Sequence, residues 1–187
     1  SVLRARGDNF SLTTIDEKIK IFEKSGVNTI FFTEFTSEFS RQNPEQFVDY
    51  FLNLTNIKRV VVGENFKFGK NGTGNAKFLQ EKLAVLNINV NIIPLLKIKG
   101  TIVSSTLIRN CIHDRLFKEA ENYLGRNYII SGIVMYGKSI GKKIGFPTAN
   151  LNVQGKILPQ SGVYSGSVHF NGKEYFAMIF IGTPMLR

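Results

Sequence analysis

Two oxygen-bearing side chains follow a proline in the second half of the chain, and their types suit a hard metal ion. Thr148 and Asn150 stand two residues apart, directly after Pro147. In an extended segment, side chains two residues apart leave the same face of the backbone. Mg²⁺ prefers oxygen ligands and usually keeps waters and substrate phosphates as its other ligands. The spacing therefore predicts that Thr148 and Asn150 hold Mg²⁺ as part of a nucleotide complex.

A stretch rich in glycine and lysine precedes these two donors. Glycines recur every four residues from 137 to 145, and Lys138, Lys142 and Lys143 lie between them. Glycine lets the backbone approach a ligand closely, and backbone N–H groups beside ammonium groups can cradle a phosphate. The predicted nucleotide-binding residues are Gly137, Gly141, Lys142, Gly145 and Pro147. The alternative is a basic glycine-rich hairpin that binds no ligand.

A cluster of hydroxyl side chains opens a predicted helix in the first half of the chain. Ser104, Ser105 and Thr106 are consecutive, and Arg109 falls one turn after Ser105 on the same helix face. The start of a helix presents unpaired N–H groups that attract phosphate, and a guanidinium can add hydrogen bonds to the same oxygens. These residues are therefore predicted to bind nucleotide phosphates. An ordinary N-cap beside a surface arginine is the alternative.

A loop with two phenylalanines follows a predicted strand. Between Gly63 and Gly69 the chain carries Asn65, Phe66 and Phe68. Ligands of open α/β sheets bind beyond the carboxyl ends of strands, and this loop leaves such an end. In an extended loop the two phenylalanines share a side and can cover a planar ring, while Asn65 offers hydrogen bonds. Two core phenylalanines beside a turn fit the same pattern equally well.

These motifs resemble, in the same order, those of the bacterial bifunctional riboflavin kinase/FAD synthetase family. Residues 63–69 are similar to the flavin-side loop of its nucleotidyltransferase domain, and residues 102–110 to its phosphate-binding SSTxxR motif. Residues 142–151 contain the specific PTAN motif and, with 158–166 and 181–183, resemble its riboflavin kinase domain. The resemblance implies that ATP and Mg²⁺ are used to phosphorylate riboflavin to FMN. It also implies that FMN is then adenylylated to FAD with release of pyrophosphate, and that Asn65, Phe66 and Phe68 bind the flavin.

The residues that would carry out the chemistry of either reaction are not visible. The family's H-x-G-H motif has no counterpart, because the two histidines are His113 and His169. A kinase benefits from a carboxylate base, which in this family lies downstream of the residues seen here. Glu174 follows a turn and is expected to face solvent. We therefore leave the catalytic residues unassigned and expect the sequence to be part of a longer protein.

Alternating helix and strand signals place the first two motifs in an α/β domain. Helix starts are indicated at the capping box of Thr14 and Glu17, at the N-cap Asn43, near Ala76 and at Asp114, with Gly125 ending the last helix. Strands are expected over 27–33, 59–63 and 88–93, and the second of these reads as buried on both faces. Such alternation predicts a Rossmann-like nucleotidyltransferase domain with a parallel sheet, which we place over residues 1–125.

Beyond this boundary the helix signals stop and glycine turns separate the remaining predicted strands. Strands are expected over 128–136, 162–170 and 173–181, with a tight turn at Asn171 and Gly172. A series of this kind suits a small antiparallel β-barrel, which is also what the resemblance implies for a riboflavin kinase domain. We place this second domain over residues 126–187 and expect both domains to lack a part.

The formal charge of +10 is concentrated in the second domain, which contains seven Lys or Arg residues and only one acidic residue, Glu174. This excess predicts an anionic partner, and lysines within glycine turns favour a nucleotide over nucleic acid. The resemblance implies that the partners are flavins and adenine nucleotides. The apolar runs are too short to span a membrane, and one cysteine, Cys111, fits a reducing cytoplasm.

Two alternatives remain: a nucleotidyltransferase with a non-flavin substrate, and a basic nucleic-acid-binding module. The oligomeric state is not indicated.

Overall fold

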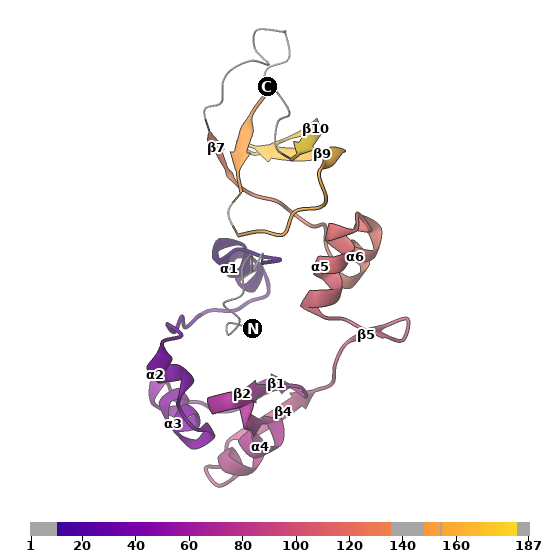
Figure 1. The fold of residues 1–187 in the computed structure, drawn as a ribbon. Helices are drawn as coiled ribbons and strands as arrows, with labels where there is room; N and C mark the ends of the chain where they lie inside the picture. The colour runs from indigo at the N-terminus through magenta and orange to yellow at the C-terminus, as the bar shows by residue number, and fades with distance from the viewer. Residues whose placement is uncertain (1–10, 136–147, 154, 183–187) are drawn as a thin grey trace. The chain divides into compact units, whose positions relative to one another are not determined.

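The structure of the chain, a computed structural model, describes residues 11–135, 148–153 and 155–182 (Figure 1). These residues belong to two compact units. The described part of the first unit is residues 29–103, and the second unit contains residues 11–28 together with the described residues from 104 onward. The second unit therefore joins an N-terminal segment to the C-terminal half of the chain.

A parallel pair of strands forms the centre of the first unit. β1 (Arg59–Gly63) pairs with β4 (Asn89–Ile93) so that Val60 lies opposite Val90. The connection between them contains α4 (Ala76–Ala84), which contacts β4. Two parallel strands joined through a helix confirm the predicted α/β arrangement of this part of the chain.

The apolar core of the first unit lies on one face of this strand pair. It includes a side chain of α3 (Pro44–Leu54), which begins with the predicted capping box between Asn43 and Gln46. The buried core residues are Val48, Val60, Phe68, Leu79, Leu83 and Val90. On the opposite face of β1, Val61 is 59% exposed. The prediction that this strand is buried on both faces is therefore wrong, because the core side chains occupy only one of them.

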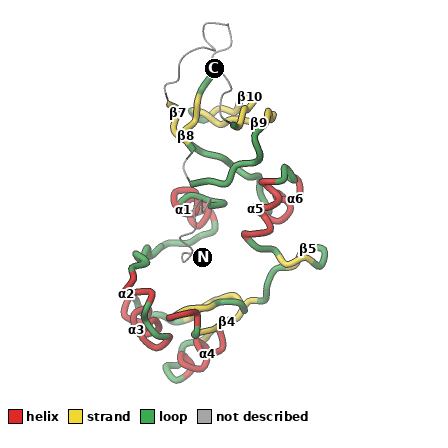
Figure 2. The backbone as a smooth tube through the Cα atoms, in the orientation of Figure 1, coloured by secondary structure: helices red, strands yellow, loops and turns green. Residues whose placement is uncertain are grey.

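Short elements complete the first unit (Figure 2). They are α2 (Ser37–Ser40), a 3-10 turn (Lys70–Gly72), and the antiparallel pairs β2 (Lys67–Phe68) with β3 (Gly74–Asn75) and β5 (Lys97–Ile98) with β6 (Thr101–Ile102). The strand predicted over 27–33 is not formed, since these residues pair with no strand in the part of the chain that the structure describes. Residues with high strand propensity form a strand only where a neighbour offers hydrogen-bonding partners.

The described residues of the second unit form three helices. α1 (Ile15–Lys24) begins with the predicted capping box of Thr14 and Glu17, and α5 (Ser105–His113) begins at the predicted N-cap Ser104. α6 (Phe117–Leu124) packs against α5.

The start of α6 differs from the prediction, which placed its N-cap at Asp114. Asp114 instead ends α5 as its C-cap, and Arg115 adopts a left-handed φ of 64° that separates the two helices. The end of α6 is as predicted, because Gly125 closes it in the left-handed conformation that glycine adopts without a steric cost. Cys111 is buried, in keeping with a packing role, and this burial together with Glu119 and Asp114 raises the pKa of its thiol.

Four strands of the second unit form two antiparallel pairs. β7 (Ile133–Met135), shorter than predicted, pairs with β8 (Asn150–Asn152), and β9 (Gly162–Phe170) pairs with β10 (Lys173–Ile181). The last two strands have the predicted bounds, and Asn171 and Gly172 form the expected turn with φ of 49° and 74°. Within the described residues these pairs remain separate sheets, so a closed barrel is not present there. Nor does the described part of the chain contain a helix whose length and apolar character would allow it to cross a membrane.

Candidate functional site

The start of α5 brings together the residues predicted to bind phosphate. Ser104 Oγ accepts a hydrogen bond from Leu107 N at 3.2 Å and caps the helix. Arg109 Nη2 donates to Thr106 Oγ1 at 3.3 Å, so the guanidinium is held beside the first turn. Ser104, Ser105 and Thr106 are all exposed. The first turn therefore presents hydroxyl groups, the positive end of the helix dipole and a cation at the surface, which together suit a phosphate.

The loop predicted to meet a planar ring leaves the carboxyl end of β1. Phe68 is only 6% exposed and belongs to the apolar core. Its ring stacks on that of Phe66, with 5.4 Å between the ring centroids. Phe66 is half-buried, and Asn65 is exposed. The alternative interpretation of a core phenylalanine therefore describes Phe68. The surface that this loop offers to a ligand comes from Asn65 and the uncovered part of Phe66.

Two features fix the position of this loop. Glu64 joins the ends of the two parallel strands, because its N–H donates to Ile93 O at 2.9 Å and its Oε1 accepts from Leu95 N at 3.0 Å. Gly74 lies against Phe68, and a Cβ at this position would sit 2.7 Å from the phenylalanine ring. Only glycine therefore lets the Phe68 ring reach its place in the core.

The predicted magnesium ligands lie at the start of β8. Asn150 is the first residue of this strand, opposite Met135 of β7, and Thr148 precedes it. Both Thr148 and Asn150 are exposed. Two accessible oxygen donors fit a magnesium ion that keeps waters and phosphates among its ligands. The residues of the predicted phosphate cradle lie outside the described residues: Gly137, Gly141, Lys142, Gly145 and Pro147.

Neither histidine contributes to a recognisable metal centre. His113 and His169 are exposed and lie next to Asp114 and Glu174, at 2.7 Å and 3.7 Å respectively. In the ranges 11–135, 148–153 and 155–182, no three or more His, Cys, Asp or Glu side chains are grouped so that they could hold a metal ion. The side chain of Glu174 is 60% exposed, as the sequence predicted.

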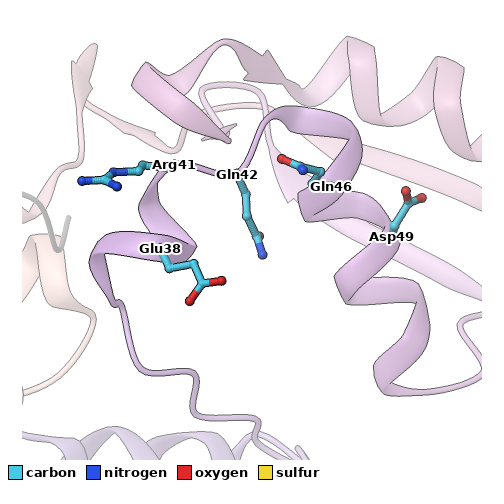
Figure 3. Close-up of a pocket in the computed structure, with 5 residues that line it drawn as sticks. All are labelled: Glu38, Arg41, Gln42, Gln46 and Asp49. Atoms are coloured by element: carbon cyan, nitrogen blue, oxygen red, sulfur yellow. The ribbon is translucent and has the colours of Figure 1, made fainter.

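A polar hollow that the sequence did not reveal lies between α2 and α3. Its volume is about 430 Å³, and its lining residues are Glu38, Arg41, Gln42, Gln46 and Asp49. Figure 3 shows the side chain of Gln42 extending between the two helices. The hollow contains none of the predicted site residues. Polar residues on and between surface helices are typical of solvated surface, so no sequence signal distinguishes these.

A second unpredicted feature is a buried ion pair in the second unit. Lys156 is 2% exposed, and its Nζ lies 2.6 Å and 2.9 Å from the two carboxylate oxygens of Glu17. The same ammonium donates to Ile129 O and lies 4.7 Å from the centre of the Tyr128 ring. Ser131 Oγ donates to the Glu17 carboxylate at 2.6 Å. The sequence identified Glu17 only as part of a capping box, and a solitary lysine gives no sign that it is buried.

Burial and hydrogen bonding act in opposite directions on Glu17. Burial alone raises the pKa of its carboxyl group, but the bonds from Lys156, Ser131 and Thr14 and the charge of Lys156 together lower this pKa below its ordinary value. Burial, followed by the negative charge of Glu17, raises the pKa of the neighbouring Tyr128 hydroxyl. The cluster therefore contains a stabilised carboxylate beside a neutral phenol.

Comparisons with known proteins agree with the order of the motifs. A sequence profile described as FAD synthetase matches residues 1–107, and one described as riboflavin kinase matches residues 124–186. A bifunctional riboflavin kinase/FMN adenylyltransferase from Buchnera aphidicola is 35% identical over 91% of this chain and 56% of its own length. The protein of the same name from Listeria monocytogenes is 34% identical over 91% of this chain and 54% of its own length.

A solved structure resembles nearly the whole chain. It is named as a macrolide-efflux protein from Streptococcus pneumoniae, has a TM-score of 0.85 and 27% sequence identity, and the match covers 98% of this chain and 60% of that one. Compared with the two curated relatives, from Buchnera aphidicola and Listeria monocytogenes, the chain spans little more than half of their length.

Proposed function

Because the chain belongs to the FAD synthetase family and a riboflavin kinase match follows in the same sequence, we propose that the intact protein makes FAD from riboflavin in two ATP-dependent steps. In the first step a riboflavin hydroxyl attacks the γ-phosphorus of ATP, giving FMN and ADP. In the second step the FMN phosphate attacks the α-phosphorus of another ATP, giving FAD and pyrophosphate. The observation that carries the proposal is the order of the two family matches on one chain.

In the adenylylation step, the start of α5 binds the phosphates of ATP. Ser104, Ser105 and Thr106 supply hydroxyl and backbone N–H donors, and Arg109 supplies positive charge from the same helix turn. The flavin ring lies against Phe66, with Asn65 as its hydrogen-bonding partner and Phe68 supporting Phe66 from the core. Such sites accelerate a reaction by positioning the reactants and neutralising charge.

In the kinase step, the glycine- and lysine-rich stretch contacts the nucleotide. The contacts come from Gly137, Gly141, Lys142, Gly145 and Pro147. Thr148 and Asn150 hold Mg²⁺, and the exposure of both residues supports this role. When bound, Mg²⁺ neutralises the phosphate charge that develops during transfer. The base that accepts the proton of the riboflavin hydroxyl is unassigned.

The finer organisation of the intact protein is part of the proposal. The adenylyltransferase domain covers residues 1–125 of this numbering, and residues 126–187 form part of a small antiparallel barrel. The partners are flavins and adenine nucleotides, not nucleic acid, and the protein works in the cytoplasm. The concentration of positive charge in residues 126–187 supports small anionic ligands.

The direct test gives the intact protein riboflavin, ATP and Mg²⁺ and separates FMN from FAD by chromatography. Both products are expected, and the absence of either contradicts the proposal. If the protein also fails to quench flavin fluorescence, a nucleotidyltransferase with another substrate is favoured. Polynucleotide binding that falls steeply with added salt would instead indicate a nucleic-acid-binding module.

Arg109→Ala separates the two steps. Loss of this guanidinium is expected to lower kcat/KM for adenylylation by about 10- to 100-fold, while FMN formation from riboflavin stays unchanged. Asn110→Ala, an exposed neighbour on the same helix, is the matched control. An equal loss of both activities in Arg109→Ala would contradict the assignment of this residue to adenylylation.

Asn150→Ala should have the reverse effect, weakening the kinase and its response to Mg²⁺.

A further inference from the structure

The buried ion pair ties together segments that belong to different family matches. Glu17 lies in α1, within the FAD synthetase match, whereas Lys156 lies within the riboflavin kinase match. The backbone makes the same connection, since Ser11 N donates to Gly155 O at 2.6 Å and Ile157 N donates to Ser11 O at 3.1 Å. The segment that contains α1 therefore belongs to the same compact unit as the kinase strands.

The contacts of the pair are concentrated at one end of the β7–β8 ladder. The two strands are antiparallel, with Ile133 opposite Asn152 and Met135 opposite Asn150. The residues that enter β7, 128–131, and those that follow β8, 155–157, therefore lie toward the same end of the ladder. Lys156, in the second segment, contacts Ile129 of the first, and Glu17 contacts Ser131 of the first and Lys156 of the second.

Each segment is held by its own hydrogen bonds to this cluster. On the β7 side, Ile129 O accepts from Lys156 Nζ, and Ser131 Oγ donates to Glu17. On the β8 side, Lys156 Nζ donates to the Glu17 carboxylate, and Ile157 O accepts a hydrogen bond from Tyr128 Oη at 2.8 Å. The Glu17 carboxylate thus accepts hydrogen bonds from both sides of the ladder, and an ammonium buried to this degree requires such a partner.

The opposite end of the same ladder carries a predicted kinase residue. Asn150 begins β8 there, opposite Met135, the last residue of β7. We propose that Glu17 is a positioning residue for phosphoryl transfer, because through Lys156 it fixes the base of the strand pair whose far end carries Asn150, the proposed Mg²⁺ ligand. This role rests on the proposed function, and it makes the efficiency of the kinase reaction depend on a residue of the FAD synthetase segment.

The test compares the two reactions of the intact protein in Glu17→Gln. We expect the KM for Mg²⁺–ATP in FMN formation to rise about 2- to 30-fold, with a smaller change in kcat, because the base of the β7–β8 ladder is held less firmly. Adenylylation of supplied FMN should keep its wild-type kinetics. Glu23→Gln, which removes an exposed carboxylate from the same helix, is the matched control and should leave both reactions unchanged.

Hydrogen exchange gives a second measurement that does not require activity. Lys156→Met should speed amide exchange in β7, β8 and α1 while leaving β1 and β4 at their wild-type rates, which also excludes global unfolding. Lys173→Met, on the exposed end of β10, is the control for loss of a lysine.

In the double variant Glu17→Gln/Lys156→Met, the rise in KM should be smaller than the product of the two single rises, because neither charge is left unpaired.

The outcomes separate the two proposals. If the wild-type protein forms no FMN, the proposed function fails, while the exchange experiment still shows whether Glu17 and Lys156 hold the ladder. If the wild type forms FMN but Glu17→Gln leaves the KM for Mg²⁺–ATP unchanged, or lowers adenylylation instead, the positioning role is wrong. Faster exchange without a change in KM would equally overturn it, since the pair would then serve stability alone.

Discussion

The strand pair β1–β4 and the strand pair β7–β8 are held in place by different kinds of interaction. Around β1 and β4, six apolar side chains are buried together, and α4 supplies two of them, Leu79 and Leu83. At the base of β7 and β8, the most deeply buried side chain is the charged Lys156, and all three residues of β7 are exposed. Apolar packing is non-directional and independent of pH, whereas an ion pair depends on both partners and on ionisation. The two regions should therefore respond differently to substitution and to acid.

The largest effect is expected from a cavity in the apolar region. Leu83 is 1% exposed, and Leu83→Ala should lower the free energy of unfolding by about 3–5 kcal/mol because the packed core cannot refill the space. Hydrogen exchange should become faster in β1 and β4 and remain unchanged in β7 and β8. Leu86→Ala, at a side chain that is 52% exposed, is the control and should change stability little. An equal increase in exchange in both strand pairs would mean that the two regions are not held separately.

A somewhat smaller effect is expected from removing one charge of the buried pair. Glu17→Gln leaves the Lys156 ammonium buried with a neutral amide and the Ile129 carbonyl, which should cost about 2–3 kcal/mol of unfolding free energy. The change should be confined to the second unit, with β7, β8 and α1 exchanging faster. Chemical unfolding followed by peptide-resolved hydrogen exchange measures both quantities. If Glu23→Gln destabilises the protein to the same extent, the effect belongs to helix charge and not to the pair.

The same contrast explains how much of the fold the sequence could predict. The parallel pair β1–β4, the capping boxes of α1 and α3, and the β9–β10 hairpin follow from local patterns: apolar runs, cap residues and an Asn-Gly turn. The extended run 27–33 has the right residue types for a strand but finds no pairing partner in the described chain. Strand pairing depends on a distant segment, and residue types alone cannot supply that information.

The candidate sites show the same limit at the level of single residues. The position of Ser104, Ser105 and Thr106 at a helix start was predictable, because capping residues act on their own helix. Whether Phe68 faces a ligand or the core was not, since the answer depends on the packing of α3 and α4 around it. Glu17 and Lys156 were missed for the same reason, because 138 residues lie between these two contacting side chains in the sequence. The magnesium and flavin roles remain predictions.

Acid should weaken the ionic region selectively. The folded protein lowers the pKa of Glu17 below its ordinary value of 4.5, so the stabilising effect of this carboxylate is complete above that value. It is lost as the pH falls through the lower pKa of the folded state. Tyr128, whose pKa is raised, stays neutral throughout this range. The difference in unfolding free energy between wild type and Glu17→Gln should therefore shrink as the pH falls below 4.5, whereas that between wild type and Leu83→Ala should stay constant. A difference that does not change with pH would remove the ionic interpretation.

The smallest effect is expected where one neutral hydrogen bond of the ionic region is removed. Tyr128→Phe keeps the ring that faces Lys156 at 4.7 Å but removes the hydroxyl that donates to Ile157 O at 2.8 Å. We expect a loss of about 0.5–1.5 kcal/mol, because one carbonyl loses its partner while the charged pair stays intact. Faster amide exchange should be limited to residues 155–157 and β8, and Tyr175→Phe, at a half-exposed position, is the control. If Tyr128→Phe destabilises as strongly as Glu17→Gln, the hydroxyl and not the ion pair holds the base of the ladder.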